Sequence, residues 1–206
     1  MPPVTEEPQL RPQAERSEAT RVRIVEATRA LFREQGYEAV STSNILRAAG
    51  VSRGGLYHHF ENKEQLLVEV FAAVERDLLE RLAQQAEEQP TPFAALRAWA
   101  QAYLDECLAS EELQRIGLLH ARRVLPWDVW REMAMGYGLG LTVETVRAAI
   151  EAGEMRGEDP EAMTQLIVAA LIEAATMIVF ADDQARERGR VGAAVDTLLE
   201  GLRNGS

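Results

Sequence analysis

Residues 41–60 read STSNILRAAGVSRGGLYHHF, and this stretch decides the fold that the sequence predicts. Ser41 can cap a helix that Gly50 ends. Ser52 can cap a second, short helix that runs to about His59. Because a turn of three or four residues that begins with glycine sets two helices at a steep angle, the spacing predicts a helix-turn-helix.

The rest of the chain also predicts helices. Apolar residues recur mostly at spacings of three and four, and no stretch shows the alternation of a strand. A first helix is expected to end at Gly36, and a long one to run from Asn62 to about Glu88. Further helices are expected over 92–109, 111–124, 127–155, 160–182 and 191–203. The predicted fold is all-α, with an N-terminal three-helix head and a C-terminal helical bundle.

Composition divides the chain into parts. The 206 residues carry a net charge of −11, which alone argues against a nucleic-acid partner. However, residues 20–63 have a net charge of +3 and residues 64–206 one of −12. We expect a disordered arm over residues 1–15, a helix-turn-helix domain over 16–62 and a helical body over 63–206. Cys107, the sole cysteine, excludes an intramolecular disulfide, and without a secretory signal at the N-terminus the chain is expected to be cytoplasmic.

The second helix of the motif has side chains suited to a DNA major groove. Arg53 can pair with a guanine edge through two hydrogen bonds, and His58 can reach a base. Gly54 and Gly55 are poor helix formers, and a close approach to DNA would explain them. Hydroxyl, imidazole, ammonium and backbone N–H groups can contact phosphates. The predicted DNA-binding set is Ser41, Thr42, Ser43, Ser52, Arg53, Gly54, Gly55, Tyr57, His58, His59 and Lys63.

Residues 36–67, GYEAVSTSNILRAAGVSRGGLYHHFENKEQLL, resemble the signature of the tetracycline-repressor-like (TetR/AcrR) bacterial regulators. The resemblance spans about fifty residues, from Arg21 to Phe71. It implies a homodimer that binds a palindromic operator and a helical body that binds a small-molecule effector and dimerises through its last two long helices. It places Ser41, Thr42, Tyr57, His59 and Lys63 on phosphate-contacting positions and Arg53, Gly55 and His58 on base-facing ones.

The predicted body contains aromatic residues on helix faces that turn inward. Such residues are usually core, but they also line ligand pockets between helices. Trp99, Tyr103, His120 and Trp130 are the candidates for effector contact, and the pattern leaves core and pocket roles open.

The two C-terminal helices are unusually apolar. Residues 163–181 are long enough to cross a bilayer, but Glu173 lies near the middle and both flanks are acidic. We therefore expect no membrane span. Two such helices from each of two subunits would form a four-helix bundle, although packing within one subunit remains an alternative.

Other functional classes have little support. His58 and His59 are neighbours on a helix and diverge by about 100°, which disfavours a metal site. The sequence shows neither a paired nucleophile and base nor a cofactor loop, so we expect no enzyme, no cofactor and no metal. A helical scaffold that no longer binds DNA is disfavoured because Arg53, Tyr57 and Lys63 are intact. The sequence thus predicts a ligand-responsive repressor.

Overall fold

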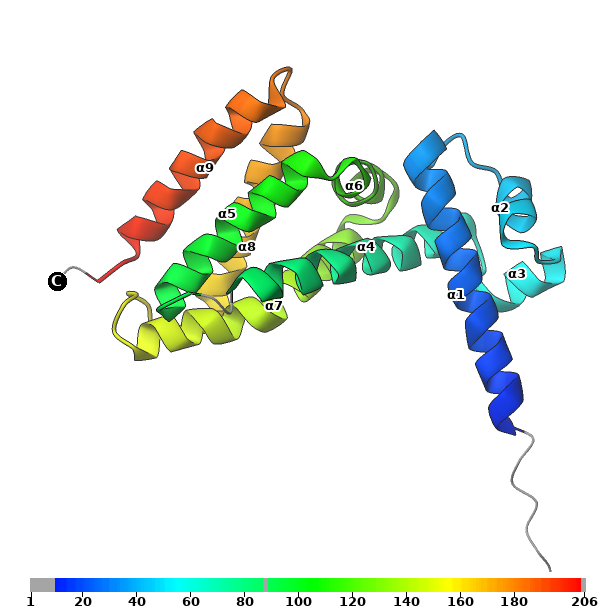
Figure 1. The fold of residues 1–206 in the computed structure, drawn as a ribbon, viewed down its shortest axis with the longest axis horizontal. Coiled ribbons are helices and arrows are strands. Elements are labelled where there is room, and N and C mark those ends of the chain that lie inside the picture. The colour runs from blue at the N-terminus through cyan, green and yellow to red at the C-terminus, as the bar shows by residue number, and fades with distance from the viewer. Residues whose placement is uncertain (1–9, 87–88, 205–206) are drawn as a thin grey trace, which may run out of the picture. The chain divides into compact units, whose positions relative to one another are not determined.

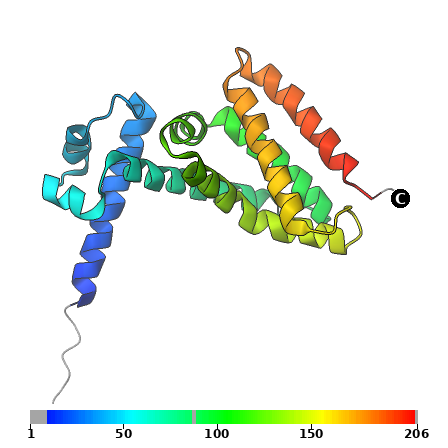
Figure 2. The ribbon, with the colours of Figure 1, turned by 180° about the vertical axis from the view of Figure 1, so that it is seen from behind.

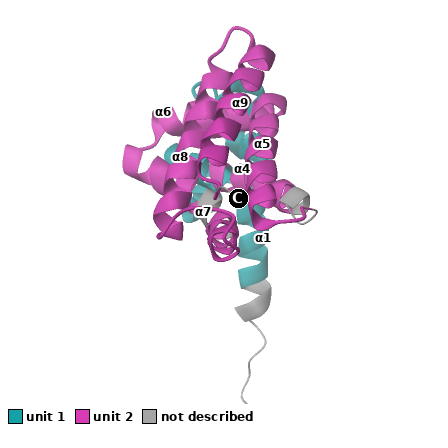
Figure 3. Cartoon of the chain, turned by 90° about the vertical axis from the view of Figure 1, so that its left-hand side faces the viewer, with its two compact units in different colours: residues 1–70 teal, residues 71–206 magenta. Residues whose placement is uncertain are grey.

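The computed structural model describes residues 10–86 and 89–204, and this part of the chain is helical with no strand beyond an isolated bridge between Met155 and Arg203. The chain divides into two compact units, residues 1–70 and 71–206 (Figure 3). The predicted all-α class is confirmed.

The first unit is the head. It contains α1 (Leu10–Gln35), α2 (Thr42–Ala49), α3 (Arg53–His59) and the first two turns of α4 (Lys63–Ala86). Apolar side chains from each helix and from the loops between them bury together. The fully or nearly fully buried ones include Ile24, Phe32, Val40, Ile45, Leu56, Phe60 and Leu67.

The start of α1 differs from the sequence expectation. Residues 10–15, which were expected to be disordered, form the first turns of α1. Pro12 is tolerated there because the N–H groups of a first helical turn have no acceptor within the helix. Residues 1–9 of the expected arm lie outside the described residues. The two compact units divide after Val70, inside α4, whereas the expected boundary at residue 62 falls in the loop before α4.

The second unit is the body, in which α5 is the central helix. It packs against α7, α8 and α9, and α8 also packs against α7 and α9. Figures 1 and 2 show α8 and α9 lying side by side. Its elements after α4 are α5 (Pro92–Ala109), the π-helix η1 (Leu113–Ala121), α6 (Arg122–Val124), α7 (Trp127–Glu151), α8 (Pro160–Val179) and α9 (Gln184–Gly201).

Three helix assignments in the body were wrong in detail. The expected helix 111–124 is largely a π-helix, a form that leaves no simple sequence signature. The helix expected to reach residue 155 ends at Glu151, because Gly153 takes φ +71°. The last helix begins seven residues earlier than residue 191, since the Asp183 side chain accepts a hydrogen bond from the Arg186 N–H and caps it.

Polar contacts join α9 to α5. The Arg188 guanidinium donates to Asp105 Oδ1 at 2.9 Å and to the Gln101 carbonyl at 3.0 Å. The Gln101 amide donates in turn to the Gly192 carbonyl at 3.0 Å. A Cβ on Gly192 would meet the guanidinium of Arg188 in the same helix and lie 3.0 Å from Gln101 Oε1, so this glycine leaves room for those two side chains. These contacts explain why a polar segment that looked like a loop is helical.

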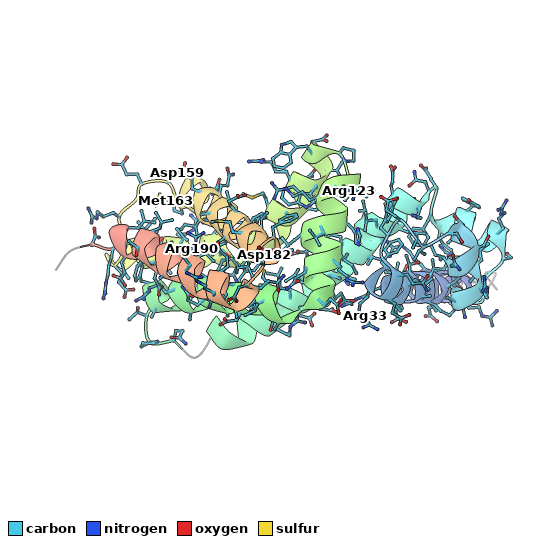
Figure 4. The ribbon with its side chains drawn as sticks, turned by 90° about the horizontal axis from the view of Figure 1, so that it is seen from above. Arg33, Arg123, Asp159, Met163, Asp182 and Arg190 are labelled. Carbon is cyan, nitrogen blue, oxygen red and sulfur yellow. The ribbon has the colours of Figure 1, made fainter. Side chains whose placement is uncertain are left out.

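One face of the α8–α9 pair is apolar and exposed. Leu166 is 69% exposed and Leu198 is 62% exposed, and a groove of the same face is lined by Met163, Ala170 and Leu202. Figure 4 labels Asp159 and Met163 at the start of α8 and Asp182 at the turn before α9. Within the described residues α8 alone has the length and apolar composition to cross a membrane, and it is partly buried in the body. That combination fits a helix that packs against protein.

Candidate functional site

The helix-turn-helix is held by hydrogen bonds that the sequence predicts. The Ser41 hydroxyl accepts from the Asn44 N–H at 3.2 Å, and the Asn44 side chain accepts from the Ser41 N–H at 2.9 Å, which completes a capping box. Gly50 takes the left-handed conformation at φ +62°. The Ser52 hydroxyl then accepts from the Gly55 N–H at 3.1 Å. The turn therefore fixes α3 in position with respect to α2.

The exposed face of α3 has side chains that are accessible to a partner outside the chain. Arg53, Tyr57 and His58 are exposed, with Tyr57 at 48%. Arg53 has neither a hydrogen bond nor an ion pair in the part of the chain that the structure describes. His59 is half-buried, and its ring lies 6.2 Å from that of Phe60. The whole predicted DNA-binding set lies in the head. Lys63 is in the first turn of α4, and the other residues are on α2, on α3 or at the N-caps of these two helices.

The glycine pair in α3 has no packing role within the head. A Cβ added to Gly54 would meet nothing within 4 Å, and one added to Gly55 would make only ordinary contact with Ser52 and Val51. Both residues also have helical backbone angles that alanine would adopt. The absence of a side chain at these positions is therefore not required by the fold.

Lys63 has a structural role that sequence reasoning missed. Its ammonium donates to the carbonyl of Tyr37 at 2.8 Å and to that of Val40 at 2.9 Å, and lies 4.0 Å from the centre of the Tyr37 ring. Burial lowers the pKa of Lys63, partly offset by the nearby charge of Glu38. These bonds tie the start of α4 to the loop that precedes α2. Two of the three ammonium donors are thereby occupied.

The body contains a cavity that brings together three of the four predicted effector residues. Trp99 and Tyr103 line it from α5 and Trp130 lines it from α7. The Trp99 and Tyr103 rings are stacked with centres 6.1 Å apart, and the Trp130 indole N–H points at the Gly117 carbonyl of η1 at 3.5 Å. Apart from Glu75 of α4, the remaining wall residues are apolar and belong to α4, α7, α8 and η1.

His120 does not line this cavity. It lies in a separate hollow beside Leu119, Arg123 and Phe180. Gly117, three residues earlier in η1, occupies the wall of the first cavity instead. Because η1 is a π-helix, its faces could not be assigned from the ordinary helical period.

Sequence reasoning also missed Glu75, the only carboxyl group among the described residues of the cavity wall. Burial raises the pKa of Glu75 from its ordinary value of 4.5 to about 7. Its position was a usable signal, because it falls four residues after Phe71 and three before Leu78, on the apolar face of α4. Burial likewise raises the pKa of Tyr103 and that of Cys107, which is fully buried.

Comparison with known proteins identifies the chain. Residues 24–70 match the family described as "Bacterial regulatory proteins, tetR family", and residues 93–202 match the "Tetracyclin repressor-like, C-terminal domain". The chain belongs to the TetR family. Members are ligand-responsive, DNA-binding transcriptional repressors that bind operators as homodimers, and this TetR-family chain is a regulator of that kind.

Individual TetR-family relatives are similar over most of the chain. The chain is 26% identical to the transposon Tn10 TetC protein of Escherichia coli, over 75% of this chain and 78% of that one. It is 26% identical to the regulator TtgR of Pseudomonas putida, over 92% and 94%. A solved TetR-family regulator from Pectobacterium atrosepticum superposes with a TM-score of 0.80 at 29% identity, covering 93% of this chain and 97% of that one.

We expect Glu75→Gln to stabilise the protein in a pH-dependent way. Because the pKa of Glu75 is raised on folding, the folded state holds this proton more tightly between pH 4.5 and 7, and stability falls as pH rises through that window. At pH 8 the variant should therefore be more stable than the parent by up to about 3 kcal/mol, and near pH 4.5 the difference should vanish. Urea unfolding at the two pH values measures this effect.

Glu80→Gln is the matched control, since Glu80 lies on the same helix but is exposed. It should leave the pH dependence of the unfolding free energy unchanged. A stability gain for Glu75→Gln that is equal at both pH values would contradict the assignment of a protonated, buried carboxyl.

Proposed function

We propose that α3 recognises operator bases while the residues around it bind phosphates, and that a small molecule in the body cavity controls this binding. The observation that carries the proposal is the exposed, unpaired Arg53 on a helix fixed by caps at both sides of a tight turn. Arg53, Gly54, Gly55 and His58 are the base-facing residues. The phosphate-facing set is Ser41, Thr42, Ser43, Ser52, Tyr57, His59 and Lys63, whose ammonium keeps one donor for this purpose.

The charge division supports the head as the DNA-binding unit. The net charge of +3 over residues 20–63 attracts phosphates, whereas the −12 over residues 64–206 repels them. We therefore assign DNA binding to residues 16–62 with Lys63, and effector binding and dimerisation to the remainder of 63–206. TtgR and the Pectobacterium atrosepticum protein are both named as transcriptional regulators, which supports a cytoplasmic, non-enzymatic role.

The exposed apolar face of α8 and α9 supports dimerisation through these two helices. Isolated apolar side chains on a surface are common, but here Leu166, Leu198 and the groove between them form a continuous patch. Two copies of this patch would bury each other across a two-fold axis. The dimer would then set the separation of the two α3 helices, which must match about one turn of DNA or a multiple of it.

Effector control follows from the contacts that α4 makes at both of its sections, with the cavity and with the head. Its residues Phe71 and Glu75 line the cavity, and its first residue is Lys63, which holds the loop before α2. An effector that favours a different position of α4 would disturb the head through this helix. Release from DNA needs only about 1–3 kcal/mol of coupling between the two sites.

Selection of bound DNA from a random pool tests base recognition. The parent should select a site with two-fold symmetry and half-sites about 34–36 Å apart, or a multiple of this spacing. Arg53→Ala should lose preference at one base pair per half-site, at a cost of about 1–3 kcal/mol. Arg23→Ala, which removes the same charge from an exposed position of α1, should keep every base preference. An unchanged selection with Arg53→Ala would refute the role of Arg53.

Gly54→Ala should separate folding from DNA binding. The substitution fills open space in a helix, so the free energy of unfolding should rise by about 1 kcal/mol. Operator affinity should fall by about tenfold or more, because the added methyl group keeps α3 away from the bases. Gly189→Ala, at an equally open helical position in α9, should give a similar stability gain at unchanged affinity. Tighter operator binding by Gly54→Ala would contradict the close approach.

Leu198→Arg should give monomers in sedimentation velocity, because it places a charge in the centre of the apolar α8–α9 face. The control is Ala193→Arg, which introduces the same side chain at an exposed position on another side of α9 and should remain a dimer. A dimeric Leu198→Arg protein would show that the subunits associate through a different surface.

A further inference from the structure

The body cavity combines aromatic walls with a single acidic group. Four aromatic side chains line it, namely Phe71, Trp99, Tyr103 and Trp130. Among the wall residues that the structure describes, Glu75 is the only carboxyl group, and none is a lysine, arginine or histidine. This composition differs from that of an ordinary hydrophobic core, in which an apolar side chain would take the place of Glu75.

Glu75 is held at the cavity without a partner of its own. Within the described chain it forms neither an ion pair nor a hydrogen bond. Its carboxyl group lies beside Gly117 of η1: a Cβ on Gly117 would lie 3.6 Å from Glu75 Oε1, an ordinary contact distance, and 3.3 Å from the Phe71 ring. A glutamine, or any apolar residue of similar size, would avoid the cost of desolvating a carboxylate here.

A buried carboxylate is stabilised by a positive charge, and aromatic rings attract the same charge through their faces. Since the cavity wall has no cation, the positive charge must come with the ligand. We propose that the cavity binds a small organic cation, whose charge Glu75 balances and whose apolar part contacts the aromatic walls. This inference rests on the proposed function, because it names the chemical class of the effector.

The size of the cavity restricts the ligand further. The space outside the protein atoms is about 470 Å³, a figure that includes open solvent, and the closed part has room for little more than water. Any organic ligand must therefore displace side chains of the close-packed wall. A compact ligand of about one ring and a substituted nitrogen displaces fewer of them than a long chain.

The pH dependence of binding follows from the groups around Glu75. On α4 and α5 the titratable neighbours are Tyr103, which lines the cavity, and Cys107, one turn further along α5. The cavity-lining residues of η1, α7 and α8 are uncharged. Because burial raises the pKa of Glu75 to about 7 and raises those of Tyr103 and Cys107 above their ordinary values, only Glu75 changes charge between pH 6 and 8.

A matched pair of probes tests the proposal directly. Phenyltrimethylammonium carries a permanent positive charge and no hydrogen-bond donor, and tert-butylbenzene is its neutral counterpart of nearly the same shape. Binding to the full-length protein is measured by calorimetry and by the fluorescence of Trp99 and Trp130. The cation should bind at least about tenfold more tightly than the neutral probe at pH 8. Its affinity should fall by about tenfold at pH 6, where Glu75 is mostly protonated.

Two variants separate charge from shape. Glu75→Gln keeps the size of the side chain and should abolish both the preference for the cation and the pH dependence. Glu80→Gln removes an exposed carboxylate from the same helix and should retain both. Equal binding of the two probes, failure of the cation to bind, or a cation preference that survives in Glu75→Gln would each overturn the proposal.

Operator DNA distinguishes this inference from the proposed function. The cation should release the parent protein from its selected DNA and should not release Glu75→Gln, which should still bind that DNA. If the protein binds a two-fold symmetric site but other compounds release it, the proposed function stands and the cationic effector is wrong. If the protein binds no DNA, the proposed function fails regardless of what occupies the cavity.

Discussion

The head of this TetR-family regulator depends on the ammonium of Lys63. Its two hydrogen bonds, to the carbonyls of Tyr37 and Val40, join the first turn of α4 to the loop between α1 and α2. The Tyr37 carbonyl also accepts a hydrogen bond from the Val40 N–H at 3.3 Å, so the ammonium adds a second donor there and supplies one to the Val40 carbonyl. The position of the loop determines where Ser41 begins α2, and α2 with its glycine turn determines the direction of α3. The recognition helix is thus oriented by a contact that lies outside the helix-turn-helix itself.

Most of the fold was predictable because its signals are local. Ser41, Gly50 and Ser52 act through hydrogen bonds and backbone angles within a few residues of themselves, and the structure shows the caps where the sequence predicts them. Errors arose where distant contacts decide. The contacts of Arg188 with α5 support the early start of α9, although Asp183, which caps it, was a local signal that sequence reasoning overlooked. The π-helix η1 leaves no simple pattern in neighbouring residues.

The candidate site shows the same division between local and distant information. Trp99, Tyr103 and Trp130 were predictable as inward-facing aromatics, and they do meet at one cavity, but their periodicity could not separate core from ligand contact. His120 lies in a separate hollow, on a face that the π-helical geometry determines, and its role as an effector contact stays a prediction. Glu75 was overlooked as one more glutamate in an acidic body, although it occupies an apolar position of α4. The role of Glu75 becomes visible only in the structure, where the described residues of the other cavity walls include no positively charged side chain.

The nine-residue π-helix η1 has a mechanical consequence for the body. A π-helix spans one more residue per hydrogen bond than an α-helix, so each bond encloses a wider ring than the chain prefers. A slip of one residue back to the α-helical pairing would turn everything that follows by about 100°. In this chain the segment that follows includes Arg122, whose guanidinium lies 5.4 Å from the centre of the Trp130 ring. Exchange between the two hydrogen-bond patterns would therefore change the contact of Arg122 with Trp130, a residue of the cavity wall.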